Sequence, residues 1–137
     1  MPKFGKRSAA NLAEANEDLQ TLFNEVIKTY DCSVIEGRRG EAEQNKLFNS
    51  GKSKLKFPKS KHNSEPGEPC NAVDVVPYPI DWSDMRRFMH FGGYVEAVAN
   101  QLYEAGKMQK RIRWGGDWNS DHIFTESFFD APHFETV

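Results

Sequence analysis

Three stretches of the chain have helical signals, and in the first of them apolar residues recur at intervals of three or four, a spacing typical of amphipathic helices. The first stretch predicts a helix over residues 9–29. A shorter helix is expected over residues 41–49, because a glycine follows it closely. The third stretch predicts a helix that begins at Asp81 or Ser83, either of which can cap it, and ends near residue 105.

Four short segments between and after these helices predict strands, over residues 32–36, 71–76, 111–114 and 133–137. Residues 51–70 contain five lysines, three prolines and two glycines and are expected to form a loop. A loop of this length in a small domain is usually functional or mobile. Helices and short strands mixed in this order indicate an α+β fold with a small, mostly antiparallel sheet flanked by helices.

Composition limits the kinds of protein that the chain can be. Its 137 residues suit one domain with one core, so we expect residues 1–137 to form a single domain. The net charge of -2 gives no reason to expect a nucleic-acid partner, although residues 52–61 carry five lysines and no acid. No segment approaches the roughly 18 apolar residues of a membrane span, so we expect no stable membrane association.

Two further features bear on the cellular compartment. Residues 1–7 are basic but are not followed by an apolar segment, so we expect no secretory signal. The only cysteines are Cys32 and Cys70, which is too few for a disulfide framework in a chain of this size. Both are therefore expected to be free thiols.

An aspartate interrupts the apolar strand predicted over residues 71–76. Asp74 has alanine and valine neighbours on both sides, so both faces of this strand are apolar. A buried carboxylate without a partner is energetically expensive. Asp74 therefore needs a strong partner, which is either an arginine, a cluster of backbone amides or a metal ion.

Two histidines and a second aspartate lie in segments that could complete a metal site. His62 closes a polar segment, where it is either a surface residue or a ligand. In the last predicted strand His133 and Glu135 share one face, whereas Phe134 points to the other. Asp130 lies in the turn before this strand and is either a turn residue or a carboxylate beside the metal.

Two histidines and one carboxylate form the ligand set of many catalytic zinc sites, which keep a fourth position for water. Zinc lowers the pKa of that water and polarises the carbonyl group under attack. A nearby carboxylate can accept the proton of the water and later deliver it to the leaving amine. This set of residues suits amide hydrolysis, and the chain lacks the HExxH motif of helix-borne metalloproteases.

Six segments in order along the chain carry motifs of a known family. They are Glu36–Arg39, the helix around Gln44, Pro58–Asn63, Ala72–Trp82, Arg113–Trp118 and Pro132–Glu135. Each motif is weak alone, but the ordered set resembles the phage L-alanyl-D-glutamate peptidases of the VanY-type D-alanyl-D-alanine carboxypeptidase family. The resemblance implies a Hedgehog/D-Ala-D-Ala peptidase-like fold, a zinc cofactor and a peptidoglycan stem peptide as substrate.

The resemblance also implies roles for individual residues. The implied zinc ligands are His62, Asp74 and His133. Asp130 is implied as the catalytic acid and base, and Arg39 and Ser60 as residues that face the substrate. Arg39 would bind a carboxylate or the developing oxyanion, for which its forked, permanent charge is suited. From its own surroundings in the sequence, Arg39 is equally well a solvated turn residue.

The chain departs from the family pattern around the first two ligands. Eleven residues separate His62 from Asp74, more than in the common pattern, and Cys70 replaces a glycine. The catalytic carboxylate is Asp130 where many relatives have glutamate, so its backbone must approach the metal more closely. We expect the ligand set to be kept and the substrate cleft beside the 51–70 loop to have its own shape.

A second cation site is possible in the polar segment after the third predicted strand. Asp117, Asn119 and Asp121 alternate along the chain, and oxygen ligands at alternate positions suit Ca²⁺. The segment lacks the glycine at the sixth place and the glutamate at the twelfth place of an EF-hand loop. The alternative is a turn-rich loop held by Asx hydrogen bonds.

The leading hypothesis is a monomeric zinc endopeptidase, an endolysin that cuts the L-alanyl-D-glutamate bond of peptidoglycan. Without a secretory signal, such a protein would wait in the cytoplasm of a bacterial host and act in the periplasm once the inner membrane is permeabilised. The same motifs also fit a D-alanyl-D-alanine carboxypeptidase. A non-catalytic zinc-containing binding module is the third alternative, and an intact Asp130 argues against it.

Overall fold

The structure is a computed structural model and describes residues 2–137. In order along the chain, its elements are α1 (Lys6–Ala13), α2 (Glu17–Val26), β1 (Cys32–Glu36), α3 (Glu41–Asn49), β2 (Ala72–Pro77), α4 (Met85–Glu104), β3 (Ile112–Trp114) and β4 (His133–Thr136). The strands form one sheet in the order β1-β2-β4-β3, with every neighbouring pair antiparallel. The predicted α+β fold with a small antiparallel sheet is confirmed.

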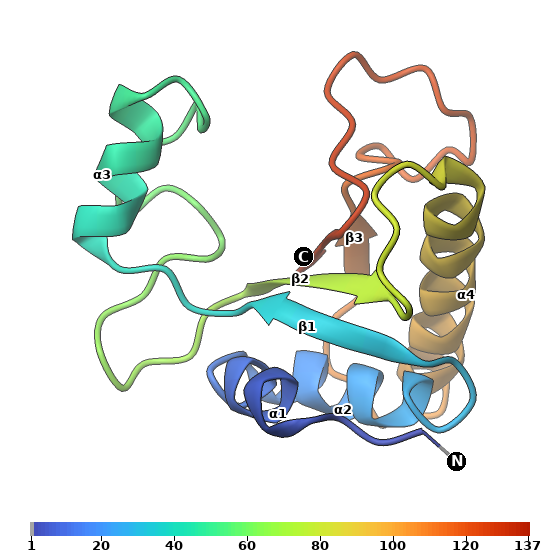
Figure 1. The fold of residues 1–137 in the computed structure, drawn as a ribbon. Coiled ribbons are helices and arrows are strands. Elements are labelled where there is room, and N and C mark those ends of the chain that lie inside the picture. Colours follow the sequence, from blue (N-terminus) through green and yellow to red (C-terminus); the bar gives the residue numbers. More distant parts are fainter. Residues whose placement is uncertain (1) are drawn as a thin grey trace.

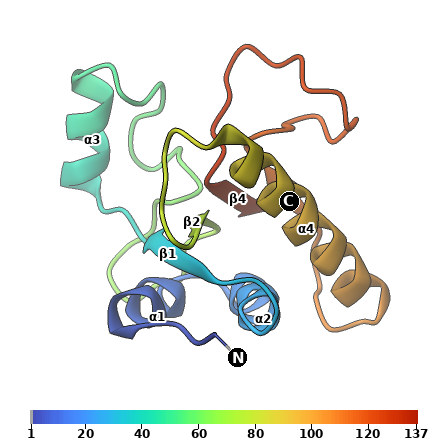
Figure 2. The ribbon, with the colours of Figure 1, turned by 45° about the vertical axis from the view of Figure 1, so that its right-hand side comes forward.

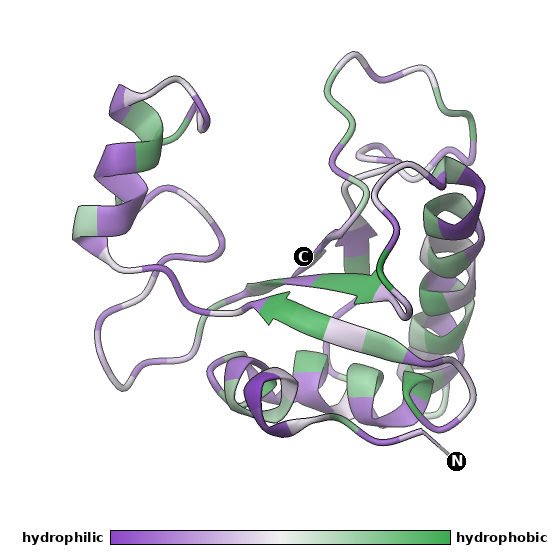
Figure 3. Ribbon diagram, in the orientation of Figure 1, coloured by the Kyte–Doolittle hydropathy of each residue, from purple (hydrophilic) through white to green (hydrophobic). Residues whose placement is uncertain are grey.

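Three helices, α1, α2 and α4, contribute with all four strands to one apolar core (Figure 1). Apolar positions gather on the strands and on the sides of these helices that face them (Figure 3). The largest fully buried apolar side chains are Trp114, Phe23, Phe91, Phe134, Leu19 and Leu22. Burial of one such side chain stabilises the fold by about 1.5–3 kcal/mol. The helix α3 stands apart from the sheet, as the turned view also shows (Figure 2).

Alternation along β2 and β4 separates the core from the opposite face of the sheet. Val73, Val75 and Phe134 belong to the core. Asp74 and His133 are direct cross-strand partners, so their side chains lie next to each other on the opposite face. The sheet thus holds two of the expected ligands side by side on rigid backbone.

The first predicted helix, over residues 9–29, is wrong in one respect, because the chain forms two helices with a break between them. Asn16 caps α2, where its side-chain oxygen accepts a hydrogen bond from the Leu19 amide at 3.0 Å. The Asn16 amide donates to the Cys70 carbonyl at 2.9 Å, and the Cys70 amide donates to the Glu14 carbonyl at 3.0 Å. These contacts with a distant segment satisfy the backbone groups that the break leaves open.

The long helix α4 begins at a different cap from those predicted. Asp84, rather than Asp81 or Ser83, is the N-cap residue, and its side chain accepts a hydrogen bond from the Arg87 amide at 3.3 Å. Gly92, within this helix, lies against the indole of Trp114. A Cβ at Gly92 would approach the Trp114 ring to 2.3 Å, so only glycine allows this contact.

One buried glutamine joins α3 to the long loop that follows it. The Gln44 side chain is fully buried and donates to the Leu55 carbonyl and to Ser53 Oγ. Its carbonyl oxygen accepts hydrogen bonds from Arg39 Nη1 at 2.9 Å and from Asn63 Nδ2 at 3.1 Å. Gln44 therefore holds the helix, the loop and Arg39 in one arrangement.

Both cysteines are buried free thiols, as predicted. Burial raises the pKa of Cys32 to about 12 and that of Cys70 to about 11. Among residues 2–137, no helix is both long enough and apolar enough to span a membrane.

Candidate metal centre

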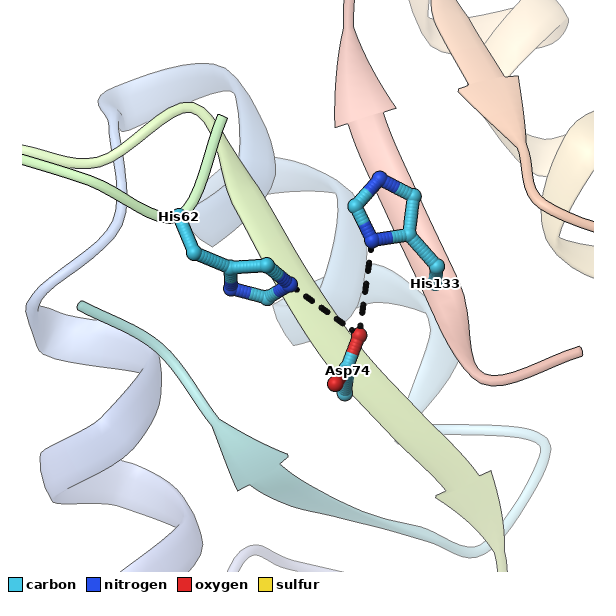
Figure 4. A group of neighbouring side chains, drawn as sticks. All are labelled: His62, Asp74 and His133. Atoms are coloured by element: carbon cyan, nitrogen blue, oxygen red, sulfur yellow. Dashed lines mark hydrogen bonds and ion pairs between the residues drawn. The ribbon is translucent and has the colours of Figure 1, made fainter. Parts of the chain in front are cut away.

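His62, Asp74 and His133 come from three separate segments and meet on the open face of the sheet (Figure 4). One ligand atom from each lies within 4.8 Å of the other two. Asp74 Oδ1 lies between the imidazoles, 3.2 Å from His62 Nε2 and 3.5 Å from His133 Nδ1. The Arg39 amide donates to the His62 carbonyl at 2.7 Å and holds the loop that carries His62 against the sheet.

The remaining nitrogen of each histidine has a fixed hydrogen-bond partner. His62 Nδ1 lies 2.9 Å from the Gly37 carbonyl and His133 Nε2 lies 2.8 Å from Glu135 Oε1. Both partners are acceptors, so these two nitrogens must carry protons. When both imidazoles are neutral, as metal ligands must be, His62 Nε2 and His133 Nδ1 present lone pairs toward the Asp74 carboxylate.

Three electron-rich atoms that converge in this way repel one another unless a metal ion or a shared proton lies among them. Histidines whose second nitrogen donates to a carbonyl or carboxylate are also the usual arrangement at metal sites, because that bond orients the ring. Two imidazoles and one carboxylate suit zinc and leave a fourth position for water. The residues therefore fit the metal that the sequence predicts.

The side chains around this centre shift one another's protonation. Burial disfavours charge on His133, but hydrogen bonds to Asp74 and Glu135 outweigh it and raise the pKa of His133 to about 9. Burial likewise disfavours charge on Asp74, but hydrogen bonds from His133 and His62 hold the pKa of Asp74 well below its usual range. The site thus favours an ionised Asp74, the form that binds a cation.

Asp130 lies beside the ligands and not among them. Its Oδ2 is 3.9 Å from His133 Nδ1, and about a third (34%) of its side chain is exposed. Burial, and then the nearby charge of Asp74, raise the pKa of Asp130 above its ordinary value. The backbone of Asp130 also forms a turn, since its carbonyl accepts from the His133 amide at 3.1 Å. Asp130 can therefore form the turn with its backbone while its carboxylate stays free near the metal position.

Arg39 and Ser60 both line the cleft that contains these residues. Arg39 donates from Nε to Glu36 Oε1 at 2.7 Å and from Nη1 to Gln44, which orients its guanidinium group. Only 11% of the Arg39 side chain is exposed, so it is not a solvated turn residue. Ser60 Oγ accepts a hydrogen bond from the His62 amide at 3.3 Å and so supports the turn that carries this ligand.

The cleft has a volume of about 760 Å³ and runs across the open face of the sheet. The residues just described are among those that line it. One side is formed by α3 and residues 51–61, and the other by residues from the segment between β3 and β4. The long loop predicted over residues 51–70 therefore contributes directly to the site.

A second group of acidic side chains lies in the segment between β3 and β4. Oxygen atoms of Asp117, Asp121 and Glu126 lie within 4.8 Å of one another. Asp117 is fully buried, and its Oδ1 and both Glu126 carboxylate oxygens have no hydrogen-bond partner among residues 2–137. Asn119, also predicted here, instead exchanges hydrogen bonds with Asp121.

Sequence reasoning assigned no role to Glu135, Gln44 and Glu126. Glu135 could have been found, because it shares a strand face with His133 and lies two residues away. Gln44 was identified only as part of a family motif, and its buried hydrogen bonds to Arg39 and to the loop that follows α3 could not be inferred from it. Glu126 gave no signal in the sequence.

Comparison with known proteins agrees with the resemblance seen in the sequence. A family model described as phage L-alanyl-D-glutamate peptidase matches residues 1–137. The chain is 32% identical over 146 residues to the L-alanyl-D-glutamate peptidase of Escherichia phage T5, with 98% of each chain covered. Its fold is similar to the crystal structure of the Serratia marcescens L-Ala D-Glu endopeptidase ChiX, with a TM-score of 0.73 and 24% identity over 98% of this chain and 90% of that one. The chain therefore belongs to the phage L-alanyl-D-glutamate peptidase family.

Proposed function

We propose that this chain is a zinc endopeptidase that hydrolyses the L-alanyl-D-glutamate bond of peptidoglycan stem peptides. The observation that carries the proposal is the convergence of His62, Asp74 and His133 in the lining of a cleft, with Asp130 beside them. The choice of bond follows the relative from phage T5, which is similar over almost the whole chain. We propose that residues 1–137 act as one domain and as a monomer.

Zinc held by His62, Asp74 and His133 would supply a Lewis acid that polarises the scissile carbonyl and acidifies water. Asp130 would accept the proton of the attacking water, and the position of its carboxylate near the ligands but not among them supports this role. Its raised pKa makes it a stronger base than an ordinary aspartate. The same carboxyl group would then donate the proton to the departing amino group of D-glutamate.

Arg39 and Ser60 are proposed to bind the substrate next to the reacting bond. The Arg39 guanidinium is pre-oriented by Glu36 and Gln44, so it can stabilise negative charge without first being ordered. Ser60 lies in the same cleft, two residues before the His62 ligand.

The test is mass spectrometry of the fragments released from purified Gram-negative peptidoglycan, with a chelator and after zinc is added back. We expect new D-glutamate N-termini that disappear on chelation and return with zinc. Release of free D-alanine alone would instead establish the D-alanyl-D-alanine carboxypeptidase. No release by folded, zinc-loaded protein would contradict both and favour the binding module.

Replacement of Glu135 by glutamine should weaken zinc binding by roughly 10–100-fold while the fold is kept. Glu135 is the carboxylate that accepts from His133 Nε2, and the neutral amide of glutamine polarises this imidazole less. Zinc affinity is measured by competition with a chromophoric chelator. The matched control is Glu25→Gln, which removes an exposed carboxylate paired only with Lys28. Equal affinities for the two variants would exclude this role for Glu135.

A calcium ion bound by Asp117, Asp121 and Glu126 is proposed as a second, structural cofactor. A buried carboxylate without a partner is expensive, and three carboxylates close together repel one another. Burial and the charge of Asp117 also raise the pKa of the neighbouring Glu96. Oxygen donors of this kind are the ligands that Ca²⁺ prefers.

Calcium should therefore raise the melting temperature of the protein, and Glu126→Gln should remove most of this effect. Saturation at 100 times the dissociation constant would add about 2.7 kcal/mol of stability. The melting temperature is followed by circular dichroism with calcium, with magnesium and with neither. Glu65→Gln, an exposed loop substitution, should respond to calcium like the unmodified protein. If calcium changes the melting temperature of neither the unmodified protein nor Glu65→Gln, this site is ruled out.

The place of action is also a proposal. The family is one of phage peptidases, and the substrate lies outside the inner membrane of a Gram-negative host. We place the protein in the host cytoplasm until that membrane is permeabilised, after which it reaches peptidoglycan in the periplasm.

A further inference from the structure

The two sides of the active-site cleft differ in chemistry. The side formed by α3 and residues 51–61 presents exposed lysines, namely Lys52, Lys54, Lys59 and Lys61. The opposite side presents two aromatic side chains, Trp118 and Phe128. His62, Asp74 and His133 lie between the two sides, so a substrate that reaches them contacts both.

The aromatic side is an ordered surface next to a proposed metal ligand. The Trp118 ring lies 5.2 Å from the His133 ring, measured between centroids, and stacks on Phe128 at 5.8 Å with an interplanar angle of 15°. Trp118 Nε1 donates to the Phe128 carbonyl at 2.9 Å, which holds the pair together. Phe128 is 55% exposed. Exposed aromatic surface beside a polar site is typical of ligand-binding grooves.

The lysine side faces this pair directly. Lys54 Nζ lies 5.8 Å from the centroid of the Phe128 ring, so the two sides approach each other across the cleft. The cations of this side outnumber its two acids, Glu36 and Glu43, and Glu36 is already paired with Arg39. Uncompensated positive charge in a cleft attracts anionic groups of a substrate.

The chemistry of peptidoglycan matches this asymmetry. On the amino side of the scissile bond, a single L-alanine and a lactyl group connect the bond to a muramic acid ring. On the carboxyl side, D-glutamate continues the peptide through its γ-carboxyl group and keeps a free α-carboxylate. The substrate therefore has a sugar on one side of the scissile bond and a carboxylate on the other.

We propose that the substrate lies across the cleft in one orientation, with the muramic acid ring on Trp118 and Phe128 and the α-carboxylate of D-glutamate facing Lys54. This inference rests on the proposed function, because it assumes that the bond is cut between these two sides. Lys54 leaves the Phe128 ring, over which its ammonium group lies in the free protein, and forms an ion pair with the carboxylate of the substrate. The apolar face of the sugar ring then packs on the exposed part of the aromatic pair. The two sides then determine substrate specificity without taking part in the reaction.

The glycan contact is tested with two substrates that differ only in the sugar. These are an unreduced disaccharide tetrapeptide and the N-lactoyl tetrapeptide, which keeps the lactyl group. Phe128→Ala should raise the KM for the disaccharide tetrapeptide about fivefold and the KM for the N-lactoyl tetrapeptide little. The kcat values should be nearly unchanged. Phe128→Tyr should restore KM. The control is Phe124→Ala, an exposed aromatic residue of the same segment that does not line the cleft.

The carboxylate contact is tested with stem peptides that contain either D-glutamate or D-isoglutamine, in which the α-carboxylate is an amide. The unmodified protein should prefer D-glutamate, and Lys54→Ala should lose about threefold of this preference. Lys56→Ala is the matched control, since Lys56 lies over the Phe48 ring in the same loop but does not line the cleft. The proposed orientation would be overturned if Phe128→Ala affected the disaccharide tetrapeptide and the N-lactoyl tetrapeptide equally. It would also be overturned if Lys54→Ala left the preference for D-glutamate unchanged.

Binding measured by calorimetry separates this inference from the proposed reaction. The same ligands are titrated into zinc-loaded protein carrying Asp130→Asn, with and without each cleft substitution. In one outcome, the cleft substitutions change affinity as expected for the sugar and for the carboxylate while the unmodified protein cleaves nothing. That pair of results would support the orientation and contradict the proposed reaction. Binding that ignores both the sugar and the carboxylate would overturn the orientation even in a protein that cuts the bond.

Discussion

An Asp130→Asn protein is expected to fold and bind zinc normally but to hydrolyse peptidoglycan roughly 10²–10⁴-fold more slowly, the usual contribution of a general acid–base group. The substitution keeps the size of the side chain and removes only its basicity. The backbone contacts of residue 130, an amide donated to Gly115 and a carbonyl that accepts from His133, do not depend on the side chain. The loss should therefore appear in kcat.

The measurement combines initial rates of peptide release with zinc content and thermal melting of the same preparations. Asp31→Asn serves as the control, because Asp31 lies outside the cleft. If Asp130→Asn keeps activity within about twofold of the control, Asp130 acts only as a turn residue and another group must move the proton. If zinc is lost together with activity, the carboxylate belongs to the ligand set and its role as a separate base is wrong.

The parts of this site that follow from short-range patterns could be predicted from the sequence. Alternation along a strand places His133 on the face opposite Phe134, and an aspartate in an otherwise apolar strand indicates a buried partner for Asp74. The pairing of Asp74 with His133 is a matter of strand register, which only the folded sheet defines. The order of the family motifs supplied the ligand set of His62, Asp74 and His133. Zinc binding by these residues is a proposal.

The features that were missed depend on partners far away in the sequence. Apolar spacing continues through residues 14–16, so periodicity alone predicts one helix there. The break occurs because the segment around Cys70 supplies hydrogen bonds to it. The acidic cluster is a second example, because Glu126, which no sequence pattern singled out, lies with Asp117 and Asp121 in the folded segment.

Phe134→Ala should lower the free energy of unfolding by about 3–5 kcal/mol, the usual effect of removing a buried phenylalanine. Phe134 is fully buried and packs edge-on against Phe23, with ring centroids 5.4 Å apart, and against Phe91 at 6.0 Å. Domains are stable by only about 5–15 kcal/mol, so this change removes a large part of the total. Urea unfolding followed by circular dichroism measures it. Phe124→Ala, which removes a half-exposed ring in edge-on contact with Trp114, should cost about 1.5 kcal/mol or less.

The position of Phe134 makes this a test of how the core supports the metal centre. It lies between His133 and Glu135 on β4, so the same strand anchors the core on one face and presents the ligand on the other. Zinc that binds only the folded state should recover part of the lost stability, by about 2.7 kcal/mol at 100 times the dissociation constant. A loss below about 1 kcal/mol would mean that the core rearranges to fill the cavity. If the free energy of unfolding falls by the full amount expected above, about 3–5 kcal/mol, and zinc restores none of it, the ligands do not assemble on this strand as the structure shows.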